Sequence, residues 1–129
     1  MGIRILLVDD SSVMRKIILR SLRQAGIEVE SAVEAADGDE ALRLFQPAGV
    51  DLVICDLNMP RMGGDELARQ LRLRDPNVPI LLITAEAGRQ KLGDALACGA
   101  SDILRKPFLP DELRSRVLPL LGRSGPRAE

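Results

Sequence analysis

Short aliphatic runs recur along this chain, and each is followed by a stretch whose apolar residues are spaced as in a helix. Runs of this length, bounded by turn residues, are typical of strands that are buried on both faces of a sheet. We expect strands at 3–8, 29–35, 52–55, 79–84 and 101–105. We expect a first helix that ends at Gly26, helices at 39–45, 66–73 and 86–98, and a last helix that begins at Pro110.

This alternation of strand and helix predicts an α/β fold, with a parallel sheet covered by helices on both faces. Because crossovers between parallel strands are right-handed, few arrangements remain, and we favour the flavodoxin-like order 2-1-3-4-5. The prediction is therefore a five-stranded, three-layer (βα)5 sandwich. It would form one domain over residues 1–121, and residues 122–129 would be a tail or the start of a linker.

Charge and composition exclude several classes of function. The 129 residues carry a net charge of −1, which gives no electrostatic basis for binding nucleic acid or a membrane surface. No apolar run approaches the roughly 18 residues that span a bilayer, and the first residues do not form a secretory signal. Cys55 and Cys98 are expected to be reduced, and the absence of histidine excludes a histidine-ligated metal and a serine–histidine dyad. We expect a cytoplasmic protein.

Polar side chains stand at the ends of four expected strands. Asp9 and Asp10 follow the first strand, Asp56 follows the third, Thr84 ends the fourth and Lys106 follows the fifth. In the predicted order strands one and three are neighbours, so the three carboxylates should converge at the switch point of the sheet. Oxygen ligands of this kind suit Mg²⁺. An acid nucleophile beside a divalent cation, a lysine and a hydroxyl predicts a phosphoryl-transfer site.

Each of these residues has a more ordinary interpretation when it is taken alone. An aspartate pair after a strand more often caps a helix, a threonine at a strand end is usually structural, and a lysine before proline usually lies in a solvated turn. The prediction therefore depends on their occurring together at equivalent ends of one alternating pattern.

Five segments, which together extend over about residues 3–121, resemble the receiver domain of two-component response regulators. The segments are LLVDDSSVMR, AADGDEAL, DLVICDLNMPRMGG, ILLITAEA and CGASDILRKPF. Within that family the chain looks most like the chemotaxis-type, CheY-like single-domain regulators.

The resemblance implies a role for each acid. Asp56 would be the phosphoacceptor, and Asp10, Asp56 and the backbone carbonyl of Asn58 would bind Mg²⁺, with Asp9 acting through water. The donor would be a phosphohistidine on a sensor histidine kinase or a phosphotransfer domain, and small donors such as acetyl phosphate would also serve. The protein would not be an enzyme but a phosphoacceptor that supports its own phosphorylation and dephosphorylation, and it would act on a downstream protein target.

The resemblance also implies a switch. Thr84 and Lys106 would contact the phosphoryl group, and Thr84 would turn toward it and shift the face formed by the last two strands and helices. Ile103 stands where the family usually has an aromatic residue that moves inward, so it can fill the vacated space but offers no hydroxyl. Asn58 and Glu86 flank the pocket and would set the hydrolysis rate, and we expect a phosphoryl lifetime of seconds to minutes.

Glycine and proline suggest local departures from regular structure. Gly88 and Gly93 lie inside the expected fourth helix, where they either make the helix easy to shift or are simply tolerated on an exposed turn. The glycine pair at 63–64 should loosen the loop after the third strand. Pro119 lies inside the last helical pattern and predicts a kink or an early end near Leu118.

The first helix carries a basic face formed by Arg15, Lys16, Arg20 and Arg23. This face is expected to be solvated; alternatively, it is a docking edge for the phosphohistidine domain of the kinase.

Three other interpretations are weaker. A haloacid-dehalogenase-type phosphatase needs a second acid two residues after the nucleophile, and Asn58 stands there. A flavodoxin-like electron carrier needs a polar phosphate loop and stacking aromatics, whereas acids follow the first strand and the chain has no Tyr or Trp. A pseudo-receiver that only binds partners would not need the complete set of acids. We expect a stand-alone regulator, and the alternative is a receiver cut from a longer regulator with an effector domain.

Overall fold

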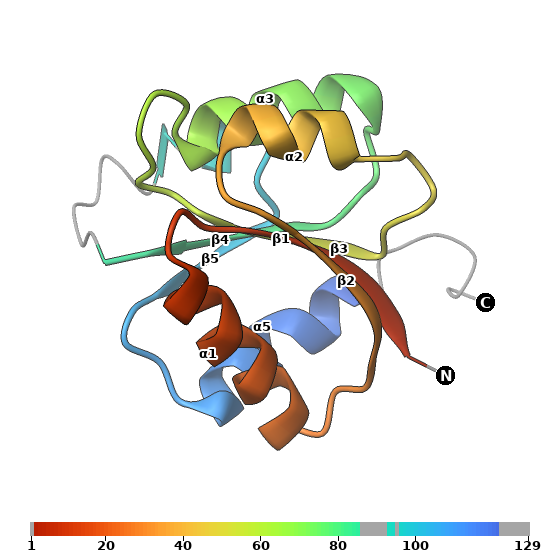
Figure 1. Cartoon of the computed structure of the whole chain (residues 1–129), viewed down its shortest axis with the longest axis vertical. Coiled ribbons are helices and arrows are strands. Elements are labelled where there is room, and N and C mark those ends of the chain that lie inside the picture. The colour runs from red at the N-terminus through yellow and green to blue at the C-terminus, as the bar shows by residue number, and fades with distance from the viewer. Residues whose placement is uncertain (1, 86–92, 95, 122–129) are drawn as a thin grey trace.

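The computed structural model describes residues 2–85, 93–94 and 96–121, in which a five-stranded sheet separates two layers of helices (Figure 1). All strand pairs are parallel, in the order β2-β1-β3-β4-β5. The predicted α/β class and strand order are therefore confirmed. The strands are β1 (Ile3–Val8), β2 (Val29–Ala35), β3 (Leu52–Asp56), β4 (Ile80–Thr84) and β5 (Asp102–Arg105).

Side chains cap the first two helices. Ser11 Oγ accepts a hydrogen bond from the Met14 amide at 3.1 Å, and an Asp37 carboxylate oxygen accepts one from the Glu40 amide at 2.8 Å. The third helix begins two residues before its predicted start. The helices are α1 (Ser12–Gln24), α2 (Gly38–Leu44), α3 (Gly64–Arg74) and α5 (Pro110–Leu121).

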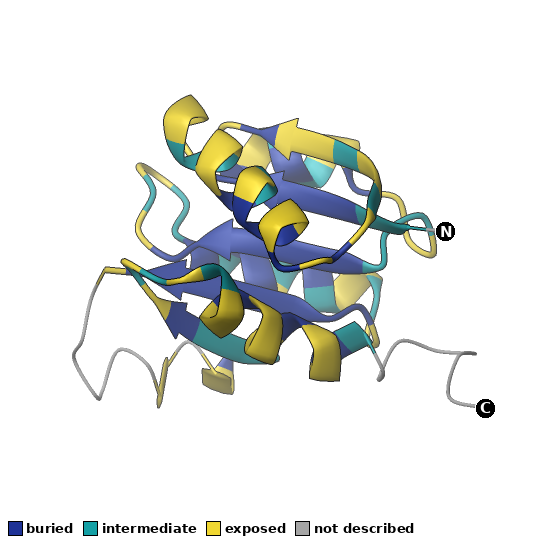
Figure 2. Cartoon of the chain, turned by 90° about the horizontal axis from the view of Figure 1, so that it is seen from below, coloured by how far each residue is buried: buried dark blue, intermediate teal, exposed yellow. Residues whose placement is uncertain are grey.

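Apolar side chains fill both spaces between the sheet and the helices. In Figure 2 the central strands are accordingly coloured as buried, and the outer faces of the helices as exposed. One cluster joins the sheet to α2 and α3 and includes Val53 and Leu67. The other joins the sheet to α1 and α5 and includes Ile54 and Leu113. Every residue of β3 and β4 is buried, because successive side chains point to opposite covered faces. These central strands therefore leave only their ends for polar chemistry.

The last helix does not end early. A kink or an early end was predicted near Leu118; α5 continues through Pro119 to Leu121, so the early end is wrong. Proline removes a single backbone donor in the final turn. Leu113, Val117 and Leu120 are all buried in the second cluster, and this packing holds the final turn on the sheet.

Some predicted features lie outside the described residues. They are Glu86, Gly88, most of the expected fourth helix and the tail at 122–129. Where that helix is described, at 93–94 and 96–97, the backbone is helical. Gly93 is exposed, and a Cβ atom there would meet no described residue within 4 Å, so packing against the described part of the chain does not require a glycine at this position.

None of the helices in the described ranges combines the length and apolarity that crossing a bilayer requires.

Candidate functional site

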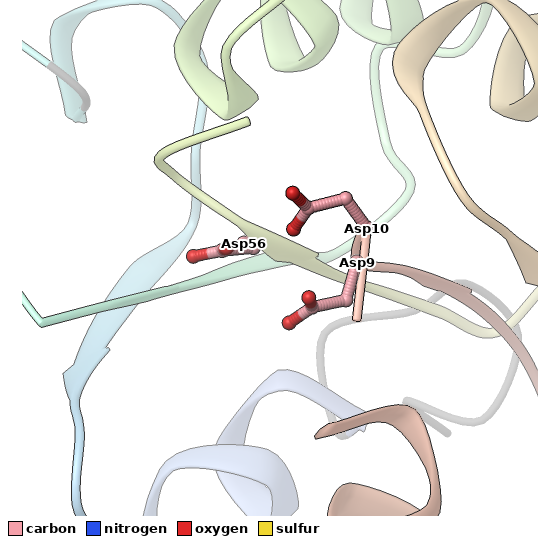
Figure 3. Close-up of side chains that lie close together, drawn as sticks. All are labelled: Asp9, Asp10 and Asp56. Atoms are coloured by element: carbon pink, nitrogen blue, oxygen red, sulfur yellow. The ribbon is translucent and has the colours of Figure 1, made fainter. Parts of the chain in front are cut away.

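Three carboxylates gather at the carboxyl ends of β1 and β3. Val8 pairs with Cys55 in the parallel register, so the residues that follow them, Asp9 and Asp56, come side by side. Asp10 adds a third carboxylate from the turn into α1. One oxygen of each acid can be chosen so that all lie within 4.8 Å of one another (Figure 3). The structure thus brings together the acids that the sequence placed at this edge.

Burial makes two of these acids costly to ionise. Asp9 is 2% exposed and Asp56 is 7% exposed, whereas Asp10 is exposed. Burial raises the pKa of Asp9, and the charge of Asp56 raises it further. Burial likewise raises the pKa of Asp56, although the charge of Lys106 partly offsets this effect. In the absence of a further cation, the ionised site is destabilised by its own charge.

The cation that the chain itself supplies is Lys106, just after β5. Its Nζ lies 3.5 Å from Asp56 Oδ1 and 3.9 Å from Asp9 Oδ2. The longer distance is an ion pair without a hydrogen bond, and Asp9 Oδ2 is buried with no hydrogen-bond partner among the residues that the structure describes. A buried carboxylate oxygen of this kind needs a donor or a metal ion. The set of oxygen ligands fits a hard divalent cation, so these acids are able to hold a metal ion.

Backbone amides orient the two buried carboxylates. The Ser11 amide donates to Asp9 Oδ1 at 2.9 Å, and this bond opposes the rise in the pKa of Asp9. The Asn58 amide donates to Asp56 Oδ1 at 3.4 Å, a long and weaker bond. Each acid is therefore held by the amide two residues after it; Lys106 meets the free oxygen of Asp9, but the same Oδ1 of Asp56 that accepts from Asn58.

Thr84 lies beside this space at the end of β4 and is fully buried. Its Oγ1 accepts a hydrogen bond from Asn58 Nδ2 at 3.3 Å. Its carbonyl accepts one from the Lys106 amide at 2.8 Å, which fixes the start of the lysine-bearing loop. Thr84 is thus connected both to the loop after Asp56 and to the loop that carries Lys106.

Ile103 lies on β5 and packs against the same cluster as Leu82, its partner on β4. Because side chains alternate along a strand, Thr84 shares the face of Leu82, and so of Ile103. The two residues predicted to move together therefore lie on one face of the sheet.

Gly64 is a site residue whose role the sequence did not reveal. A Cβ atom there would lie 2.5 Å from the carbonyl oxygen of Asp56 and 2.8 Å from Leu57 Cα. The Gly64 amide donates to the Leu57 carbonyl at 2.8 Å. The glycine pair at 63–64 was expected to loosen this loop, but Gly64 instead allows α3 to approach the backbone of Asp56 closely.

The basic face of α1 is not uniform. Lys16, Arg20 and Arg23 are exposed, as expected for a solvated face. Arg15 differs, because it is half-buried and donates hydrogen bonds to the Asp9 carbonyl and to Glu34. The sequence pattern could not separate Arg15 from the other basic residues, since helical spacing gives no information on how far a side chain reaches back.

Cys55 and Cys98 are both buried free thiols. Cys55 Sγ donates to the Asp56 carbonyl at 3.2 Å, and burial raises its pKa well above the ordinary value. Burial also raises the pKa of Cys98. The prediction of two reduced, apolar cysteines agrees with this environment.

Comparisons with known proteins agree with one another. The model of the response regulator receiver domain matches residues 5–118. The response regulator MprA of Mycobacterium sp. strain KMS is 42% identical over 126 residues, which are 98% of this chain and 54% of the relative. The chain thus spans about half the length of the curated relatives of this kind.

Solved structures show the same likeness. The chemotaxis response regulator CheY4 of Vibrio cholerae is 37% identical, with a TM-score of 0.79 over 93% of this chain and 99% of the other. A BeF3-activated receiver domain of DrrB is 26% identical, with a TM-score of 0.80 over 95% of this chain and all (100%) of the other.

Proposed function

The chain belongs to the response regulator receiver domain family, and on that premise we propose that Asp56 accepts a phosphoryl group in a Mg²⁺-dependent reaction. Receiver domains are phosphoacceptor modules of two-component signalling. The observation that carries the assignment to Asp56 is the arrangement around it: two further acids within 4.8 Å and the ammonium of Lys106 at 3.5 Å.

The residues of the site would divide the work as follows. Asp10, Asp56 and the carbonyl of Asn58 would hold Mg²⁺, with Asp9 acting through a water molecule. When bound, the metal supplies positive charge that neutralises the acids and the transferring phosphoryl oxygens. Lys106 would supply a second positive charge from the side of β5.

In the transfer step a carboxylate oxygen of Asp56 attacks phosphorus. An oxygen–phosphorus bond forms while the bond from phosphorus to the donor's leaving group breaks, and the leaving group departs with the bonding electrons. Thr84 would then donate a hydrogen bond from its hydroxyl to a phosphoryl oxygen. Thr84 Oγ1 is the acceptor in its bond with Asn58 Nδ2, so the new donated bond does not compete with that contact.

The partners follow from this chemistry. The phosphodonor would be a phosphohistidine on a cognate sensor histidine kinase or phosphotransfer domain, and hydrolysis of the acyl phosphate would reset the protein. The chain would act in the cytoplasm as a phosphoacceptor rather than as an enzyme with its own substrate. Residues 1–121 would form the receiver, and 122–129 its tail or the start of a linker.

The output would be a change in protein binding on the face made by β4, β5, α5 and the segment between β4 and β5. A pocket of about 460 Å³ opens on this face beside Lys106, so a change near the phosphoryl group can reach it directly. Its lining residues are Ile103, Leu104, Arg105, Lys106, Pro107, Glu112 and Arg116.

Two settings are compatible with this output. The likeness to the chemotaxis response regulator CheY4 supports a chemotaxis-type single-domain regulator. MprA is about twice as long as the matched region, which favours a receiver joined to a separate effector domain. Ile103 offers no aromatic hydroxyl, so an output that reads such a group is disfavoured in either setting.

Beryllofluoride, which mimics a phosphoryl group, gives the direct test. We expect the protein with Mg²⁺ to give a bound ¹⁹F resonance and to be labelled by acetyl phosphate, and Asp56→Ala to lose both. Asp51→Ala is the matched control, because Asp51 lies at the opposite end of the same strand region and should leave both signals intact. Labelling that survives in Asp56→Ala would contradict the assignment. The absence of a bound ¹⁹F signal in the unmodified protein would favour a pseudo-receiver that only binds partners.

The lifetime of the phosphoryl group tests the roles of Asn58 and Glu86. We expect decay over seconds to minutes after donor removal in Mg²⁺. A phosphorylated form that persists for hours would refute these roles.

A further inference from the structure

Arg15 differs from the other basic residues of α1 in where its side chain goes. Its Nη1 donates to the backbone carbonyl of Asp9 at 2.5 Å, and its Nε donates to Glu34 Oε1 at 2.8 Å. The Arg15 side chain is 16% exposed, although the helix face around it is open to solvent. Its guanidinium therefore bridges the end of β1 and the end of β2 beneath the acidic turn.

The carbonyl that Arg15 contacts is placed to affect two acids at once. The Asp9 carbonyl and the Asp10 amide belong to one planar peptide group. Fixing the carbonyl oxygen fixes the rotation of that plane, and with it the directions in which the Asp9 and Asp10 side chains leave the backbone. The Ser11 amide holds the Asp9 carboxylate from the other side, at 2.9 Å. The acidic turn is thus held at its carboxylate by Ser11 and at its backbone by Arg15.

Glu34 completes the arrangement. As a residue of β2 next to the β1 end, it fixes the guanidinium with an ion pair at 2.8 Å. Because the fork of a guanidinium can serve two acceptors in fixed directions, Arg15 can hold both Glu34 and Asp9. A lysine at this position has a single nitrogen and would hold one of them well. The chemistry therefore favours arginine at position 15 for a reason other than charge.

We propose that Arg15 is a positioning residue that sets the geometry of Asp9 and Asp10 for divalent cation binding, with Glu34 orienting it. This proposal rests on the proposed function of Asp56, because it concerns the Mg²⁺ of that site. Arg15 acts through the backbone and does not touch the phosphoryl group. A purely structural tie between α1 and β2 would instead change the free energy of unfolding and leave Mg²⁺ affinity unaltered.

The test compares Arg15→Ala and Arg15→Lys with Arg20→Ala, an exposed arginine of the same helix. Calorimetric titration gives the Mg²⁺ dissociation constant, and the Mg²⁺ dependence of acetyl phosphate labelling gives the rate at saturation. Loss of a residue that orients metal ligands typically weakens the metal about tenfold or more. We expect about a tenfold weaker Mg²⁺ affinity in Arg15→Ala, an intermediate value in Arg15→Lys and no change in Arg20→Ala. At saturating Mg²⁺ the labelling rate should return to within about threefold of the unmodified protein.

Glu34→Gln tests the proposal even if Arg15→Ala does not fold. This variant leaves the Arg15–Asp9 bond in place and removes only the ion pair. We expect a two- to threefold weaker affinity, by roughly the worth of one exposed ion pair. Unchanged Mg²⁺ affinity in Arg15→Lys and Glu34→Gln would overturn the positioning role even if Arg15→Ala does not fold. Failure of the unmodified protein to bind Mg²⁺ at all would overturn the proposed function itself, and so the two failures are distinguishable.

Discussion

Carboxylates at the two ends of the β1–β3 pair differ in how fully they are paired with positive charge and hydrogen-bond donors. At the amino end Asp51 accepts hydrogen bonds from the Arg4 amide at 2.8 Å and from its guanidinium at 3.1 and 3.3 Å. At the carboxyl end Asp9 and Asp56 are more deeply buried, yet they share Lys106 at 3.5–3.9 Å, and within the described part of the chain one oxygen of Asp9 has no hydrogen-bond partner. The same two strands thus carry a hydrogen-bonded ion pair at one end and a site with more negative than positive charge at the other. The difference indicates that the carboxyl end is arranged for a ligand, at a cost in stability.

The largest expected effect comes from removing the cation at each end. Lys106→Ala should slow labelling by acetyl phosphate roughly 100-fold, because a positive charge placed at the transferring group is lost. Arg4→Ala removes an equal charge from the other end and should leave the rate within about twofold. Rates measured at saturating Mg²⁺ would check this. Equal losses in both variants would show that net charge, not position, sets the rate.

Mg²⁺ should stabilise the folded protein through the acids at the carboxyl ends of β1 and β3, and not through Asp51 at the other end. At a concentration 100 times its dissociation constant, the ion should raise the free energy of unfolding by about 2.7 kcal/mol. Asp10→Asn should lose most of this increment, whereas Asp51→Asn should retain it. Denaturant unfolding with Mg²⁺ and with a chelator measures both values. An increment that survives in Asp10→Asn would place the ion elsewhere.

Neutralising one buried acid should stabilise the metal-free protein. Asp9→Asn removes a charge that burial and the neighbouring Asp56 disfavour, and its amide oxygen can still accept from Ser11. We expect a gain on the order of 1 kcal/mol without Mg²⁺. Asp51→Asn should shift stability in the opposite direction. A loss of stability in Asp9→Asn would mean that Lys106 compensates the buried acid fully.

Protonation of the buried acids at low pH should stabilise the metal-free protein, as neutralisation by substitution does. The pKa values of Asp9 and Asp56 are raised in the folded state above the ordinary value of 3.8, so the folded protein takes up protons first as the pH falls. Relative to an Asp9→Asn/Asp56→Asn double variant, the wild type should gain stability as the pH falls through the raised values, and the gain should be complete below 3.8. Unfolding of both proteins across this range, without Mg²⁺, measures the difference. A constant difference would indicate that the two acids titrate normally.

The smallest effect is expected for the pair at the amino end. The Arg4 and Asp51 side chains are 41% and 22% exposed, so solvent screens their attraction. Arg4→Ala should lower the free energy of unfolding only slightly, because a solvent-screened ion pair contributes little to stability. Chemical denaturation at low and high salt would measure this contribution, and a much larger loss would show that the backbone bond to Asp51 also depends on the arginine.

Much of the fold and of the site at the carboxyl ends of the strands could be predicted from the sequence, whereas the Arg4–Asp51 pair was not. The short aliphatic runs between helical patterns predicted the strands, and the right-handedness of crossovers between parallel strands then limited their order. The convergence of Asp9, Asp10 and Asp56 followed from their positions after neighbouring strands. Lys106 was predicted at the same edge for the same reason.

What the sequence could not predict depends on how far side chains reach and on tertiary packing. Helical spacing placed Arg15 with the solvated residues, although its length lets it turn back to the Asp9 carbonyl. The local preference of Pro119 predicted a kink or an early end near Leu118, but the helix continues because Leu120 is buried in its final turn. The amide contact from Asn58 to Thr84 joins loops that lie 26 residues apart, and no local pattern encodes it.

The glycine that lets α3 approach Asp56 has a consequence for how this sequence can vary. In a library of random replacements selected for phosphorylation, position 64 should remain glycine, because any larger residue collides with main-chain atoms that cannot move aside. Position 93, also a helical glycine, has open space around it and should accept many residues. Two identical residues would then show opposite tolerances, and the spectrum of permitted replacements would reveal the chemistry next to one of them.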